Sequence, residues 1–153
     1  MNPKISDMTE SLQIKYAAFA ARMAESGVPF ALTRVLTNDL EQTALYAQGR
    51  EPINDVNYKR ALAGLYSIDE SENKIVTWTL NSKHKPNAQG KSRAFDIVIL
   101  VNGKYNWDLK VDVDKDGISD YLEAAFIGKN CGLDCGAFWD KSKDYPHYQE
   151  KEA

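Results

Sequence analysis

An aspartate stands inside the most apolar segment of this chain. Asp96 interrupts residues 94–100, Ala-Phe-Asp-Ile-Val-Ile-Leu, which otherwise have the composition of a buried β-strand. A buried carboxylate must be paired, hydrogen-bonded or bound to a metal ion, because an isolated charge in an apolar interior costs too much free energy. Any fold that this chain adopts therefore has to bring a partner to Asp96.

The two histidines of the chain are the natural partners. His84 lies twelve positions before Asp96, and His147 lies near the C-terminus. Two imidazoles and one carboxylate can hold a zinc ion and leave a fourth position open for water, which is the mark of a catalytic zinc site. Asp144, three residues before His147, is placed to take a proton from that water. The plainer interpretation is that both histidines are hydrogen-bonded structural residues and Asp144 a solvated loop residue.

Composition and charge narrow the class of protein. At 153 residues we expect one domain spanning 1–153, and a net charge of −3 argues against nucleic acid as the partner. The chain has no run of about 18 apolar residues, so we expect no membrane insertion. Residues 1–7 lack the apolar core of a signal peptide, which predicts synthesis in the cytoplasm. Cys131 and Cys135, the two cysteines, are expected to be ordinary semi-buried thiols.

Hydrophobic periodicity and turn residues predict an α+β domain. Thr37 or Asn38 is a candidate N-cap, Asn54 another, and Gly49 a helix stop, whereas Asn102-Gly103 is typical of a hairpin turn. Helices are expected at 7–26, 38–48, 54–65 and 119–131, and strands at 28–35, 75–80, 93–101, 104–111 and near 137–138.

An acidic segment, residues 112–123, fits the pattern of an EF-hand calcium loop. From 108 to 123 there are six acidic residues and two lysines, a net charge of −4, and such local repulsion favours a bound cation. Two features depart from the pattern: Ile118 stands at position 7 rather than 8, and the preceding segment is predicted as a strand. The alternative is an acidic turn that caps the following helix. The expected calcium ligands are Asp112, Asp114, Asp116, Ile118, Asp120 and Glu123, with Gly117 at the turn.

Three short motifs carry a resemblance to a known family. Ser82-x-His84, Ala94-x-Asp96 and Asp144-x-x-His147 resemble the zinc D-Ala-D-Ala carboxypeptidase and L-alanyl-D-glutamate peptidase family, which includes many phage endolysins. Residues 41–50 are similar to the first helix motif of that family, and residues 74–84 to the strand that leads into the first ligand. The resemblance covers about residues 28–149, most of the chain.

The resemblance implies a small antiparallel sheet flanked by helices, the zinc DD-peptidase or hedgehog-like fold. It implies zinc binding by His84, Asp96 and His147, and the role of general base for Asp144. Two departures stand out. The spacing of twelve between His84 and Asp96 exceeds the usual seven or so, which a longer loop accommodates at little entropic cost. Ser82 and Gln42 match positions that contact substrate in the family. The second departure is at position 37, where Thr37 replaces the arginine that the family places five residues before Gln42. Arg34 and Arg50 are the two candidates to replace that arginine.

These implications define the expected function. We expect a phage-type endolysin, a zinc peptidase that cuts peptidoglycan stem peptides at the L-Ala–D-Glu bond. The alternatives are a D-Ala-D-Ala carboxypeptidase or dipeptidase, and a non-catalytic cell-wall-binding module on the same fold. Some endolysins of this family carry a comparable calcium loop. We further expect a monomer, made in the host cytoplasm and acting on the cell wall after release, with peptidoglycan as its partner.

Overall fold

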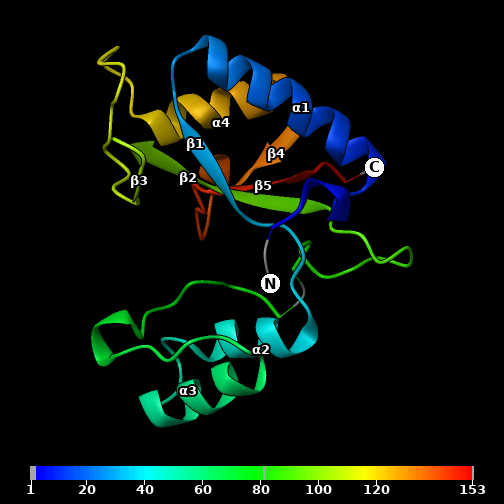
Figure 1. Cartoon of the computed structure of the whole chain (residues 1–153), viewed down its shortest axis with the longest axis vertical. Helices are drawn as coiled ribbons and strands as arrows, with labels where there is room; N and C mark the ends of the chain where they lie inside the picture. Colours follow the sequence, from blue (N-terminus) through cyan, green and yellow to red (C-terminus); the bar gives the residue numbers. More distant parts are fainter. Residues whose placement is uncertain (1–2, 81, 153) are drawn as a thin grey trace.

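A five-stranded sheet separates two layers of helices in the computed structural model, which describes residues 3–80 and 82–152 (Figure 1). One layer holds α1 (Glu10–Glu25) and α4 (Asp120–Asn130), and α2 (Asp39–Ala47) and α3 (Ile53–Leu62) lie on the other side. The strands are β1 (Phe30–Arg34), β2 (Ala94–Val101), β3 (Lys104–Asn106), β4 (Leu133–Cys135) and β5 (His147–Glu150). The predicted fold class, a small antiparallel sheet flanked by helices, is confirmed.

Strand β2 is the centre of the sheet. One edge of β2 pairs with β1. Along the other edge, the first half of β2 pairs with β5 and the second half with β3. Strand β4 pairs with β5 and extends the sheet on that side. All of these pairings between named strands are antiparallel. The hairpin between β2 and β3 turns at Asn102 and Gly103, whose φ angles of 52° and 76° are those of the predicted tight turn.

The two faces of β2 serve different purposes. Phe95, Ile97 and Ile99 belong to the main hydrophobic core, together with residues of α1 and α4. Because side chains alternate along a strand, Asp96 points to the opposite face, toward the side where α2 and α3 lie. The alternation thus explains how a carboxylate is accommodated in an apolar strand.

All four predicted helices form, and several of their ends have identifiable causes. The side chain of Asn38, one of the two predicted caps, accepts a hydrogen bond from the backbone N–H of Glu41 and starts α2. Gly49, with φ of 80°, follows the C-cap of that helix. Helix α3 begins one residue earlier than expected, with Pro52 rather than Asn54 at its N-cap position, and it ends at Leu62 rather than at residue 65. Among the described helices, none is long and apolar enough to cross a membrane.

The strand predicted at residues 75–80 is wrong. Residues 74–80, all of which the structure describes, form no strand, although they run alongside α2. The amide of Gln42 donates to the carbonyl of Thr79, and the amide of Gln48 donates to the carbonyl of Glu72. The backbone groups of a helix are already hydrogen-bonded within the helix. Helix α2 can therefore bind this segment through side chains but cannot form the backbone hydrogen bonds of a β-sheet with it. The alternating apolar residues are therefore left exposed, and Trp78 retains 56 % of its surface.

Smaller corrections concern the second half of the chain. The return strand after the hairpin ends at Asn106 and not at residue 111. The short strand expected near 137–138 is instead β4, and residues Gly136–Phe138 form a 3₁₀ helix. Cys131 and Cys135 are free thiols, as predicted, and burial raises the pKa of Cys135 to about 12.

Two glycines offer a test of how segment 74–80 is held. An added Cβ at Gly49 would collide with the backbone of Lys74 and Ile75, whereas at Gly64, which has a similar φ of 77°, it meets nothing. Gly64→Ala should cost only the positive-φ strain, about 1–2 kcal/mol. Gly49→Ala should cost clearly more, because the segment must also move away from α2. Thermal unfolding of both variants checks this, and equal losses would mean that the segment is not packed against Gly49.

Candidate metal centre and cleft

The three predicted ligands meet at the middle of the sheet. Asp96 on β2 lies opposite His147, the first residue of β5, in the antiparallel register. Asp96 Oδ1 is 3.0 Å from His147 Nδ1 and 3.1 Å from His84 Nε2. One ligand atom from each residue lies within 4.8 Å of the other two. Residues 12 and 51 positions away from Asp96 in sequence therefore form one candidate metal centre.

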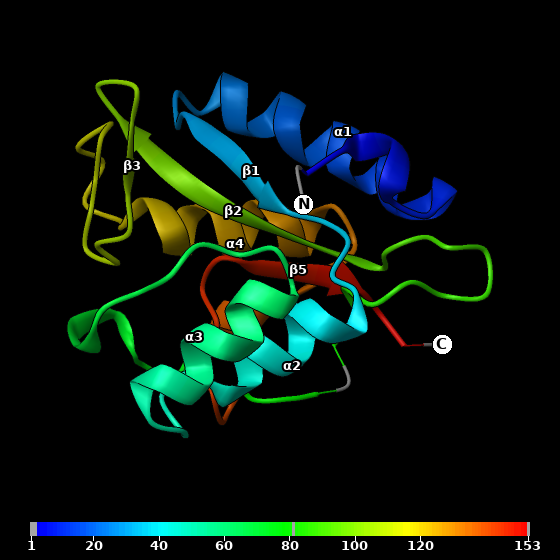
Figure 2. The same cartoon turned by 60° about the horizontal axis from the view of Figure 1, so that its bottom comes forward.

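Main-chain hydrogen bonds hold His84 in place. Its backbone N–H donates to Ser82 Oγ, and its carbonyl accepts from the backbone N–H of Thr37. Its ring Nδ1 lies 2.8 Å from the carbonyl oxygen of Val35. A carbonyl only accepts, so Nδ1 carries a hydrogen, and Nε2, which faces Asp96, is the nitrogen that can bind a metal ion. The extra residues between His84 and Asp96 form a loop that projects from one end of the sheet (Figure 2).

The charges of the three ligands support one another. Burial alone would raise the pKa of Asp96, but the charge of His84 and hydrogen bonds from His147 and His84 hold it well below its usual range. Burial opposes a charged His147, yet the hydrogen bond and charge of Asp96 raise the pKa of that imidazole. A divalent cation among these groups would replace the protons that otherwise balance Asp96.

Asp144 lines the same cleft as the three ligands. Its backbone N–H donates to the carbonyl of Gly136, and its own carbonyl accepts from the backbone N–H of His147. Any Cβ at position 136 would collide with the carbonyl of Asp144, so only glycine permits this approach. Burial, followed by the negative charge of Asp96, raises the pKa of Asp144 to about 6. A carboxyl with such a pKa is suited to exchange a proton near neutral pH.

The cleft has a volume of about 250 Å³ and brings most of the predicted substrate-contacting residues together. Ser82, Gln42 and Arg34 all line it, beside the ligands. The amide nitrogen of Gln42 is engaged with Thr79, so this residue also builds the cleft wall. The walls include Thr77, Trp78, Thr79 and Trp139, none of which is among the predicted site residues.

Arg34 and Arg50 are separated by the structure. Arg34 lines the same cleft as Asp144. Burial raises the pKa of Asp144, and the positive charge of Arg34 opposes that shift. Arg50 is not among the described residues of the cleft; its guanidinium donates to the carbonyl of Tyr46 and lies 3.9 Å over the Tyr46 ring. Position 37 supplies no cation, because the side chain of Thr37 is neutral; it is also fully buried. Arg34 is thus the arginine that reaches the candidate site.

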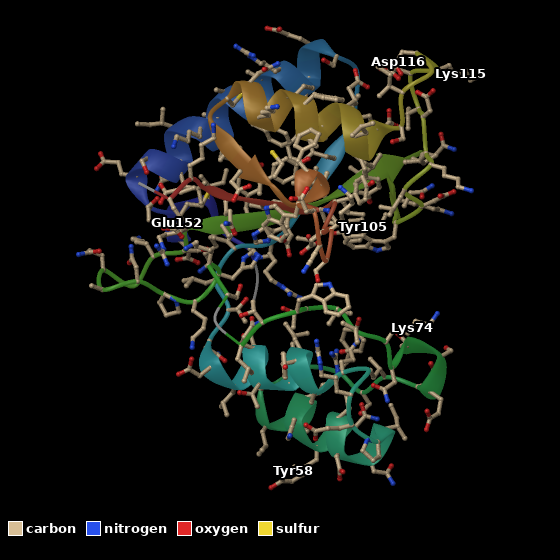
Figure 3. The ribbon with its side chains drawn as sticks, turned by 180° about the vertical axis from the view of Figure 1, so that it is seen from behind. Tyr58, Lys74, Tyr105, Lys115, Asp116 and Glu152 are labelled. Atoms are coloured by element: carbon tan, nitrogen blue, oxygen red, sulfur yellow. The ribbon has the colours of Figure 1, made fainter. Side chains whose placement is uncertain are left out.

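The acidic loop lies at the opposite end of the sheet from the His84 loop (Figure 2). Lys115 and Asp116 stand at its outer tip (Figure 3). Asp112 accepts hydrogen bonds from the backbone N–H groups of Asp116 and Gly117, which curl the loop around its carboxylate. Two groups of carboxylates converge and share one member: Asp112, Asp114 and Asp120 form the first, and Asp114, Asp116 and Glu123 the second.

Two carboxylates of this loop are incompletely satisfied. Asp120 has 0 % of its surface exposed, and its Oδ2 accepts from the backbone N–H of Val113. Its Oδ1 and Oε2 of Glu123 are buried without a hydrogen-bond partner among the described residues. Burial, and then the charges of neighbouring aspartates, raise the pKa of Glu123 to about 7, and burial raises that of Asp120. Ser119, at the N-cap position of α4, makes no side-chain capping bond.

Comparisons with known proteins find a similar sequence and a similar structure, both of L-Ala–D-Glu endopeptidases. No protein-family profile matches the sequence. The chain is 27% identical over 148 residues to the peptidoglycan L-alanyl-D-glutamate endopeptidase CwlK of Bacillus subtilis (strain 168), which covers 96% of this chain and 75% of that protein. Its structure is similar to that of the L-Ala D-Glu endopeptidase ChiX of Serratia marcescens, with a TM-score of 0.57 and 18% identity over 96% of this chain and 83% of the other. The predicted resemblance to the D-Ala-D-Ala carboxypeptidase and L-alanyl-D-glutamate peptidase family is confirmed: the sequence relative supports it over most of the chain, and the solved structure shows a shared fold.

Proposed function

We propose that this protein is a zinc peptidase that hydrolyses the L-Ala–D-Glu bond of peptidoglycan stem peptides. The observation that carries the proposal is the convergence of His84, Asp96 and His147 in one cleft with Asp144. Two imidazoles and one carboxylate are a donor set typical of catalytic zinc. The choice of bond is supported by the relative CwlK, which is named as an L-alanyl-D-glutamate endopeptidase.

The mechanism divides the reaction among residues of the cleft. His84, Asp96 and His147 would hold the zinc ion, which would supply Lewis acidity at the reacting centre when bound. Asp144 accepts the proton of the attacking water and returns it to the leaving amine, which its raised pKa permits. Arg34 places a fixed positive charge in the same cleft, where it would stabilise the negative charge that develops on the carbonyl oxygen.

We further propose a phage-type endolysin, made in the host cytoplasm and acting on the cell wall after release. Support for this origin comes from the motifs around His84, Asp96 and His147, because the family that shares them includes many phage endolysins.

Calcium at the acidic loop is the second part of the proposal. A turn that merely caps α4 needs neither the convergence of two carboxylate groups nor a fully buried Asp120 with one unpaired oxygen. A Ca²⁺ ion takes six to eight oxygen ligands, and carboxylates are its usual partners. Bound between Asp112, Asp114 and Asp120, it would offset the repulsion that raises the pKa of Glu123.

Digestion of purified peptidoglycan, followed by mass spectrometry of the products, tests the peptidase proposal. Wild-type protein should release fragments with new L-Ala carboxyl ends and D-Glu amino ends. His84→Ala should lose bound zinc and hydrolysis together, whereas Asp140→Asn, at an exposed position, should keep both. Release of terminal D-Ala instead would indicate a carboxypeptidase. A zinc-loaded protein that yields no products would indicate a wall-binding module.

Asp144→Asn should separate metal binding from proton transfer. The amide cannot act as a base, so we expect a loss of roughly 10²–10⁴ in kcat. The zinc content should remain that of the wild type, because the three ligands are untouched. Metal analysis and steady-state rates on a defined stem peptide check both parts. A variant that loses its zinc would show Asp144 to be a ligand, and a fully active one would assign the proton to another group.

Arg34 and Arg50 form a matched pair for the charge that stabilises the reaction. Arg34→Gln should lower kcat by roughly 10²–10³, the usual cost of removing such a group. Arg50→Gln, which removes an equal charge outside the cleft, should have a much smaller effect. Comparable losses in the two variants would contradict the assignment of Arg34.

Calcium should raise the melting temperature of the protein. An ion present at 100 times its dissociation constant stabilises the state that binds it by about 2.7 kcal/mol. Replacing both Asp114 and Asp116 with Ala should abolish the response, while Asp140→Asn should retain it. Isothermal titration calorimetry measures binding directly, and the absence of binding at millimolar calcium would refute the site.

A further inference from the structure

A row of polar side chains continues from His147 away from the metal centre. His147 Nε2 lies 2.7 Å from Gln149 Oε1. Gln149 Nε2 donates to Asp134 Oδ2 at 3.0 Å, and the indole N–H of Trp139 donates to Asp134 Oδ1 at 3.0 Å. Asp134 on β4 and Gln149 on β5 are directly opposite one another in the strand register. Four side chains are thereby joined from the cleft wall to a candidate metal ligand.

The chemistry of the end groups determines the direction of every hydrogen bond in this row. A carboxylate only accepts, so Asp134 requires the amide nitrogen of Gln149 to face it. The amide oxygen of Gln149 must then face His147, and an amide oxygen only accepts. His147 therefore carries a hydrogen on Nε2. Nδ1, which lies 3.0 Å from Asp96 Oδ1, is then the nitrogen that gives up its hydrogen and offers its lone pair when a metal ion binds.

The other histidine is held in a different way. His84 Nδ1 faces the carbonyl oxygen of Val35, a main-chain group that no substitution removes. The orientation of His147 depends instead on two side chains, Gln149 and Asp134. The two imidazoles also present different nitrogens to the centre, Nε2 from His84 and Nδ1 from His147.

The same carboxylate also positions one wall of the cleft. Trp139 lines the cleft, and its ring centroid lies 5.3 Å from that of His147. Its indole N–H is bound by Asp134, so the ring is held against the imidazole by the group that orients Gln149.

We propose that Asp134 and Gln149 are positioning residues for the metal ligand His147, and that Asp134 decides which imidazole nitrogen faces the metal. This inference rests on the proposed zinc centre. Partners of this kind commonly change metal affinity by 10–100-fold when they are lost. The competing role is purely structural: a cross-strand pair that fastens β4 to β5 without influencing the metal.

Asp134→Asn is the decisive variant, because it has the same size but adds a donor. The Gln149 amide is then free to turn and to present its nitrogen to His147, where two donors would oppose each other. We expect zinc affinity, measured by competition with a chelator, to fall 10–100-fold. Gln149→Leu should behave similarly, and Asp140→Asn, an exposed aspartate in the same region, should match the wild type.

Imidazole ¹⁵N spectra of the zinc-loaded protein give an independent readout, since the chain has two histidines. The wild type should show His147 protonated on Nε2 and metal-bound through Nδ1, and His84 the reverse. In Asp134→Asn the signals of His147 should shift and its Nε2–H should exchange faster with water, while those of His84 stay unchanged. Trp139→Phe, which keeps the ring, should raise KM more than it weakens zinc binding.

The outcomes separate this inference from the proposed function. A wild type that binds no zinc would overturn both. A wild type that binds zinc, with Asp134→Asn equal to Asp140→Asn in affinity, would overturn the positioning role alone. Lower melting temperatures of metal-free Asp134→Asn and Gln149→Leu, with unchanged zinc affinity, would assign the pair to the sheet and also refute the proposal.

Discussion

The structure depends on the need to neutralise one carboxylate within the central strand. Asp96 occupies β2 between core residues, where an unpaired charge is costly. The β5 register brings His147 directly opposite, and the 82–92 loop folds back to add His84. Both histidines sit at hydrogen-bonding distance from one carboxylate oxygen. Since three distant parts of the chain must converge to satisfy Asp96, the candidate centre forms only in the folded protein.

One face of the sheet packs the main hydrophobic core, and the other face carries the candidate site. Phe95 and Ile97 face the helices α1 and α4, which bury them in the main core. The face that carries Asp96 is covered more loosely, by α2 and the segment at 74–80, which is tied to that helix through Gln42. A cleft can exist on this side because its cover is held by a few side-chain hydrogen bonds and not by a packed apolar interface.

A physical connection runs between the acidic loop and the central strand. The hydroxyl of Tyr121, in the first turn of α4, donates to the carbonyl of Asn106 and accepts from the backbone N–H of Ile99. Ile99 lies three residues from Asp96 on the same strand. Ordering the start of α4 by an ion would therefore also restrain β2 and β3, although the acidic loop lies at one end of the sheet (Figure 2) and the candidate metal centre at its middle.

Local chemistry accounts for what the sequence determined by itself. The N-cap at Asn38 and the turn at Asn102-Gly103 depend only on residues close by in the sequence, so they could be predicted. A carboxylate in an apolar strand must have a charged or hydrogen-bonding partner, which the sequence also indicates. The candidate metal ligands could therefore be predicted, because the chain has two histidines that could serve as partners of Asp96.

Tertiary structure decided everything that depends on the neighbour of a segment. Residues 75–80 have the composition of a strand, but they lie along a helix that offers no free backbone groups. Arg34 and Arg50 differ only in where their guanidinium groups end, one in the cleft and one over Tyr46. Gln149 acquires its position from strand register, which sets Asp134 across from it and His147 two residues before it on the same face. Secondary-structure propensity is a property of single residues and could be judged from the sequence. Strand register, and the side chains that it places opposite one another, depend on pairs of segments that come together only in the folded chain.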